Sequence, residues 1–161
     1  MRRNRFSLLS TLLVAMVVML QGLPAWAEDA PANNMAIMRE KVRADKTLFI
    51  AQNLELTESQ AKAFWPTYDS YQKDLQILGD RLVKLIADYA KEYRTMSDDA
   101  AKKLTDEYLD IEGDLQALRK SFLPKFRTVL PDTKVARYYQ LEQKVHALMQ
   151  SELAARIPLV K

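Results

Sequence analysis

The sequence predicts an all-α protein of four helices built on a long, bent antiparallel helical hairpin, and three observations predict this fold class. Glycine is scarce, with three glycines in 161 residues, whereas leucine, alanine, lysine, glutamate and glutamine are common. Apolar side chains recur every three or four residues through two long segments, which is the period of a helix with one buried face. A polar residue that can cap a helix precedes each segment.

Residues 1–27 are expected to be an export signal. Three arginines among the first five residues give a basic start, an apolar run follows, and Ala25-Trp26-Ala27 is a small-x-small cleavage site. Cleavage after Ala27 would leave the mature protein in the periplasm. The apolar run, Leu8–Leu20, is shorter than the about 20 residues that span a bilayer, so an uncleaved membrane anchor is the less favoured alternative.

Charge and cysteine content exclude several classes of function. The net charge of +3 comes from the arginines of the expected signal, so the rest of the chain is neutral. A neutral chain lacks the basic surface that nucleic-acid binding needs, and no nucleic acid is expected as a partner. Cysteine is absent, which excludes disulfides, thiolate nucleophiles and lipid attachment through cysteine.

The segment after the expected signal begins with polar residues. Residues 28–34 are expected to be a short disordered leader, and residues 35–161 a single all-helical domain. The first helix is predicted over residues 35–53, with Asn33 or Asn34 as its cap.

The second and third helices carry the hairpin. The second is predicted from Thr57 to about residue 94 and begins in a capping box, in which the Thr57 hydroxyl accepts from the Gln60 amide and the Gln60 side chain reaches back. Ser97 is predicted to cap the third helix. Both helices keep apolar residues at a spacing of 3.5, interrupted only at Lys125, so a tight turn near Thr95 should fold them into an antiparallel pair. These seam residues are Phe64, Tyr68, Tyr71, Leu75, Leu78, Leu82, Leu85 and Tyr89, then Ala101, Leu104, Tyr108, Ile111, Leu115, Leu118, Phe122 and Val129.

Each of these two helices contains a proline. Pro66 and Pro124 lie equally far from Thr95, so they should face each other across the pair. A proline inside a helix removes a backbone hydrogen bond and kinks it. The two residues are therefore expected to form a hinge that bends the pair, and the alternative is two small kinks that packing absorbs.

A fourth helix is predicted from residue 132 to about residue 155, after Leu130 and Pro131. The apolar tail at residues 157–160 is expected to tuck against a groove, and the alternative is a frayed end.

Few residues suggest catalysis. The single histidine, His146, lies beside the apolar face of the fourth helix, and carboxylates with one imidazole make a poor metal site. No Ser-His-Asp set, glycine-rich phosphate loop or metalloprotease motif is present in the sequence. The protein is therefore not expected to be an enzyme, to hold a metal or cofactor, or to bind a small-molecule substrate.

Apolar residues outside the seam are the candidate binding residues. Trp65, Ile86 and Tyr93 lie on the second helix, and Leu109 and Leu123 lie on the third. A seam between two helices cannot bury them, so the other helices, a client protein or a second copy of the chain should cover them. A homodimer is expected because an elongated hairpin exposes much surface.

Leu56, Thr57 and Gln60 match the LTxxQ motif, and the chain resembles the LTxxQ-motif family of periplasmic proteins (Spy/CpxP-like). That family carries a second motif before its last helix. Residues 130–134 stand at this place and keep the leucine but not the threonine or the glutamine, so this copy is degenerate. The segment 64–68 looks like that of a distinct, poorly characterised branch of the family.

The resemblance implies a cradle-shaped dimer that acts as an ATP-independent chaperone or envelope-stress adaptor. It would bind unfolded client proteins on the concave side of the hairpin through apolar and charged side chains. The neutral chain departs from this pattern, because it lacks the basic bias that would steer acidic clients. The alternative is a dedicated regulatory partner, such as an inhibitor that binds the sensor domain of a membrane kinase.

Overall fold

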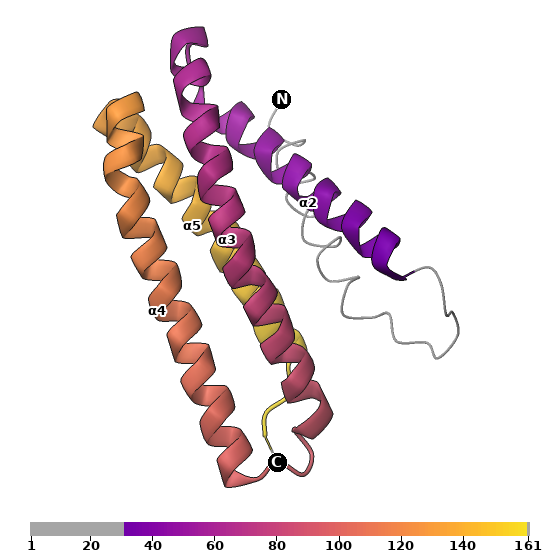
Figure 1. Ribbon diagram of the computed structural model, residues 1–161. Helices are drawn as coiled ribbons and strands as arrows, with labels where there is room; N and C mark the ends of the chain where they lie inside the picture. The colour runs from indigo at the N-terminus through magenta and orange to yellow at the C-terminus, as the bar shows by residue number, and fades with distance from the viewer. Residues whose placement is uncertain (1–30, 161) are drawn as a thin grey trace. The chain divides into compact units, whose positions relative to one another are not determined.

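The computed structural model describes the backbone of residues 31–160 and the side chains of residues 41–160. Figure 1 shows the four helices of this part of the chain, and no strand occurs in it. The helices are α2 (Pro31–Leu54), α3 (Glu58–Glu92), α4 (Asp98–Val129) and α5 (Asp132–Arg156). The prediction of an all-α fold with four helices is therefore confirmed.

The start of α2 differs from the prediction. The helix begins at Pro31 rather than at residue 35, because the fixed φ of proline and its missing N–H suit the first helical turn. Asn33 and Asn34, which were expected to cap the helix, lie within it. The expected leader thus overlaps the helix, while the predicted signal, its cleavage site and residues 28–30 lie outside the described residues.

The starts of α3 and α4 agree with the prediction, and each is fixed by a capping side chain that binds an amide three residues away. Thr57 is the N-cap of α3, and its capping box with Gln60 is complete. The Ser97 hydroxyl accepts from the Ala100 amide at 3.2 Å and caps α4. Such caps satisfy backbone N–H groups that have no partner inside the helix.

The chain forms two compact units, which are described separately. The first holds α2 with its end at Glu55, and Arg137–Arg156 of α5. The second holds Leu56–Ala136, with α3 and α4, and the C-terminal residues from Ile157 onward.

Polar contacts between distant residues join α2 and α5 in the first unit. Lys46 Nζ lies 2.8 Å from Glu142 Oε2, with only 13% and 10% of their side chains exposed. Arg137 donates to the Asn53 carbonyl at 2.6 Å and pairs with the Glu55 carboxylate at 2.9 Å. Glu55 adopts a φ of 54°, the left-handed conformation in which helices often end. Arg137 binds the Asn53 carbonyl just before this residue, so it satisfies a backbone group at the C-terminal end of α2.

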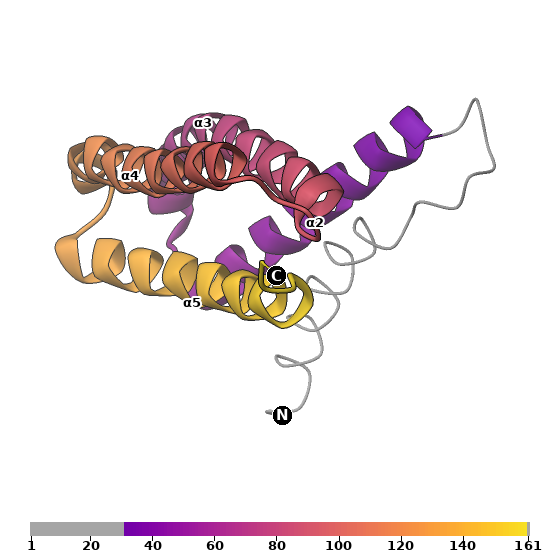
Figure 2. The same ribbon diagram turned by 90° about the horizontal axis from the view of Figure 1, so that it is seen from below.

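In the second unit α3 and α4 pack side by side, as Figures 1 and 2 show. The Phe64 ring near the start of α3 lies 5.7 Å from the Phe126 ring near the end of α4. Arg81, farther along α3, pairs with Glu107 and Asp114 of α4. These contacts give an antiparallel order.

Both predicted hinge residues lie inside continuous helices, Pro66 in α3 and Pro124 in α4. The contact between Phe64 and Phe126 sets a register in which the two prolines occupy opposite positions. Neither proline ends its helix. A joint bend of the pair at this level and a homodimer remain predictions.

Candidate binding surface

The seam between α3 and α4 is tightly packed at the end that lies away from the α3–α4 turn. Five aromatic side chains, which we call the aromatic cluster, are buried there. Their ring centroids lie between 5.3 and 6.2 Å from their neighbours, in tilted and edge-to-face arrangements. The cluster consists of Phe64, Tyr68, Tyr71, Phe122 and Phe126. Buried rings at such distances stabilise a helix pair strongly.

The opposite end of the pair, which we call the tip half, comprises residues 75–92 of α3 and 98–110 of α4. Its seam side chains keep the same spacing but are only partly buried. They are Leu75, Leu78, Leu82, Leu85 and Tyr89 on α3, with Ala101 and Leu104 on α4. Tyr108, the next seam residue, is exposed. Aliphatic seam residues are not open everywhere, since Ile111 and Leu115 of α4, which lie between this half and the aromatic cluster, are buried.

Further apolar side chains of the tip half lie open to solvent. Ile77 and Leu109 each expose 60% of their surface, and Val83 and Tyr108 are also exposed. Single exposed apolar residues are ordinary on a protein surface. Here four of them occur in one stretch of two helices beside a partly open seam, so this stretch is the candidate binding surface.

Charged side chains of the tip half are largely paired with each other. Arg81 Nε lies 3.1 Å from Glu107 Oε1, and hydrogen bonds to Glu107 and then Asp114 raise the pKa of Arg81. Hydrogen bonds from Lys84 and then Lys91 lower the pKa of Asp88 to about 2. These pairs keep the surface hydrated and leave its apolar side chains as the groups that a partner can bury.

The structure distributes the five predicted binding residues over both ends of the pair. Trp65 is partly buried and meets Phe64 edge-on at 5.0 Å, so it borders the aromatic cluster. Ile86 and Tyr93 are partly buried in and beside the tip half. Leu109 is among its exposed residues.

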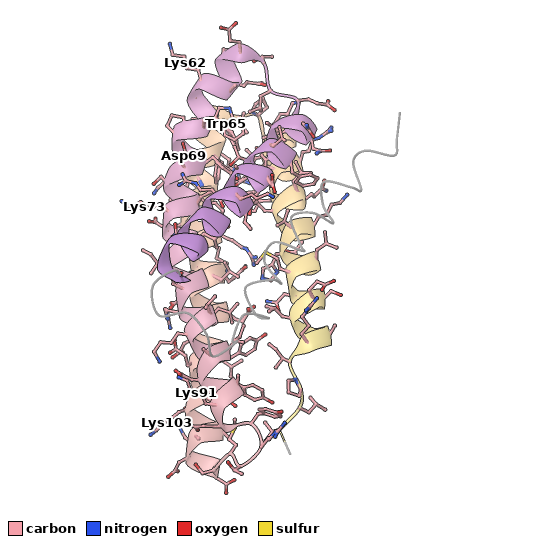
Figure 3. All side chains as sticks on the ribbon, turned by 90° about the vertical axis from the view of Figure 1, so that its right-hand side faces the viewer. Lys62, Trp65, Asp69, Lys73, Lys91 and Lys103 are labelled. Atoms are coloured by element: carbon pink, nitrogen blue, oxygen red, sulfur yellow. The ribbon has the colours of Figure 1, made fainter. Side chains whose placement is uncertain are left out.

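Leu123 lies partly buried on α4, at the end that holds the aromatic cluster. Figure 3 shows the neighbours of Trp65 along α3, where Lys62, Asp69 and Lys73 follow one outer stripe of the helix. All three of these charged residues are exposed. Trp65 and Leu123 both lie outside the residue ranges of the tip half, at the end of the pair that holds the aromatic cluster.

Three residues of this surface were not predicted from the sequence as binding residues. Ile77 and Val83 are apolar residues outside the seam, so the rule that identified Ile86 could also have found them. Tyr108 belongs to the seam by spacing, and its exposure appears only in the folded pair.

The LTxxQ-like residues serve the start of α3. Gln60 N donates to the Thr57 hydroxyl at 3.3 Å, and Thr57 N donates to Gln60 Oε1 at 3.1 Å. Leu56 is partly buried beside them. In the segment 130–134, Leu130 is buried at the end of α4, and Asp132 pairs with Arg127 at 2.9 Å.

A pair of tyrosines stands at the far end of the tip half. The Tyr89 and Tyr93 rings are stacked with centroids 6.0 Å apart. Arg94 lies with its guanidinium carbon 5.5 Å from the centre of the Tyr93 ring, and its Nε donates to the Tyr93 hydroxyl at 2.9 Å. The Tyr89 hydroxyl donates to the carbonyl of Pro158 in the C-terminal tail. We call Tyr89 and Tyr93 the tyrosine pair.

Within residues 41–160, no group of three or more histidine, aspartate or glutamate side chains is arranged to hold a metal ion. His146 Nε2 lies 3.4 Å from the amide nitrogen of Gln150 on the same helix. Among the described helices, none combines the length and the apolar character needed to cross a membrane. Comparisons with family models, curated proteins and solved structures gave no match to the chain.

Proposed function

We propose that this protein binds unfolded or stress-damaged polypeptides in the periplasm without ATP, as a chaperone or stress adaptor, and that the tip half is its binding surface. The observation that carries the proposal is the difference in burial between the two ends of the α3–α4 pair. The aromatic cluster is sealed, whereas the tip half exposes Ile77, Val83, Tyr108 and Leu109 beside a partly open seam.

Such a surface suits clients of many sequences. Unfolded chains expose apolar side chains with no fixed geometry, so a row of separate apolar contacts can bind them weakly at several points. The paired charges around Arg81 and Asp88 keep the free surface soluble. Neither feature requires a reactive group or a nucleotide.

The test is suppression of client aggregation by the mature chain, beginning at Glu28. At near-equimolar ratio, it should suppress aggregation of several unrelated unfolded proteins. The double variant Ile77→Ser, Leu109→Ser should lose most of this effect, because it removes the two most exposed apolar side chains of the tip half. Leu48→Ser, Leu148→Ser is the matched control, since both leucines are exposed but belong to the first unit.

Two outcomes would contradict the proposal. Equal loss in the test and control variants would mean that the tip half has no special role. No suppression by the unchanged protein, together with tight binding to one folded sensor domain, would select the regulatory-partner alternative. Light scattering tests the proposed homodimer separately, since a dimer has twice the chain mass and a monomer at micromolar concentration would refute it.

A further inference from the structure

The C-terminal tail, Ile157–Val160, packs with the second unit although it directly follows α5. After Arg156 the chain leaves the helix and continues to Val160 without regular secondary structure. The Pro158 carbonyl accepts a hydrogen bond from the Tyr89 hydroxyl. The tail thus contacts the end of the tip half that carries the tyrosine pair.

The tail has the chemistry of a short stretch of unfolded polypeptide. Three of its four residues are aliphatic, and the fourth is proline, whose ring lowers the conformational entropy lost on binding. Ile157 is partly buried, but Leu159 exposes 88% of its surface and Val160 is also exposed. A segment whose apolar side chains remain this exposed is held loosely and can be exchanged for another.

The tyrosine pair can accept other segments in the same way. The Tyr89 hydroxyl donates to a backbone carbonyl, a group that every residue of a client offers. The stacked Tyr93 ring is held by Arg94, which both hydrogen-bonds it and lies over its face. The pair therefore presents the Tyr89 hydroxyl from rings of fixed geometry, and a hydrogen bond to a backbone carbonyl depends little on the sequence of the chain that is bound.

We propose that Ile157–Val160 is a displaceable internal ligand of the tyrosine pair, and that extended apolar segments of unfolded proteins bind there in its place. This inference rests on the proposed function and deepens it, since it names the ligand class and a control on binding. A tail that is bound for nine-tenths of the time lowers the apparent affinity for a competing segment about tenfold.

The experiment measures binding of a fluorescent peptide with the sequence of residues 156–161 by anisotropy. The intact mature chain is compared with a chain that ends at Arg156 and with full-length Ile157→Asp, in which a charge disfavours the partly buried position. Both changes should tighten peptide binding about tenfold. In the truncated chain Tyr89→Phe should weaken binding again, while Tyr139→Phe, which removes a hydroxyl from α5 in the first unit, should not.

Each result separates this inference from the proposed function. Equal peptide affinity in the intact and tail-released chains, with aggregation suppression retained, overturns the internal ligand and leaves the chaperone proposal standing. Absence of both peptide binding and suppression in all chains overturns both. Tighter binding in both released chains, reversed by Tyr89→Phe alone, supports the inference.

Discussion

Removal of one ring from the aromatic cluster should destabilise the second unit severely. Phe126 is fully buried, and its ring centroid lies 5.7 Å from that of Phe64 and 6.0 Å from that of Tyr71. Replacement of a core phenylalanine by alanine costs about 3–5 kcal/mol, because apolar contact is lost and a cavity remains. We expect Phe126→Ala to lower the free energy of unfolding by about 4 kcal/mol, a large part of the about 5–15 kcal/mol that stabilises a typical domain.

Urea unfolding followed by tryptophan fluorescence would measure this loss at the cluster itself. Trp65 is the sole tryptophan after residue 27, and its ring meets Phe64 at 5.0 Å, so its emission reports on this end of the pair. The matched control is Leu109→Ala, which should change the free energy by less than about 0.5 kcal/mol because Leu109 is mostly exposed. Similar losses in the two variants would refute the distinction between a sealed end and an open tip half.

Three further predictions concern polar groups. Thr57→Ala should lower the unfolding free energy by about 1 kcal/mol in urea titrations, whereas Thr57→Ser should retain the cap; equal losses would show that the hydroxyl is dispensable. Glu142→Gln should cost about 3 kcal/mol because it removes the carboxylate charge that pairs with Lys46, and a variant as stable as the parent would contradict a buried ion pair. NMR titration should give Asp88 a pKa of about 2, and Lys84→Gln should raise it toward the ordinary value of 3.8. Since this pKa is lowered in the folded state, the contribution of Asp88 to stability should be present above the unfolded pKa and be lost as the pH falls from about 4 to about 2; an unperturbed carboxyl would count against the pairing.

The helix ends could be predicted where the determining contacts are local. The capping hydroxyls of Thr57 and Ser97 bind amides three residues away, so the pattern is visible in a short stretch of sequence. The same local chemistry separates α4 from α5 at Pro131. At α2 the prediction was wrong, because Asn33 and Asn34 were expected to cap the helix but it begins earlier, at Pro31.

Contacts between distant residues could not be predicted in this way. Arg137 lies 84 positions from Asn53, and nothing in its own segment indicates that its guanidinium closes the end of α2. The pairing of Lys46 with Glu142 across 96 positions is equally hidden. In the sequence, Arg137, Lys46 and Glu142 are ordinary charged residues, and each acquires its role only when α2 and α5 meet.

The uneven seam shows how the same periodicity can serve two purposes. A spacing of 3.5 residues tells which side chains face the partner helix, but it does not tell how deeply each of them is buried. The Phe64 and Phe126 rings contact each other and are fully buried, whereas Leu82 and Leu85 of the same seam are only partly buried. The aromatic cluster holds the most deeply buried side chains of the pair, while the tip half keeps apolar groups accessible. A surface that binds unfolded chains requires this division, because apolar groups that stabilise the fold by burial are no longer available to a partner.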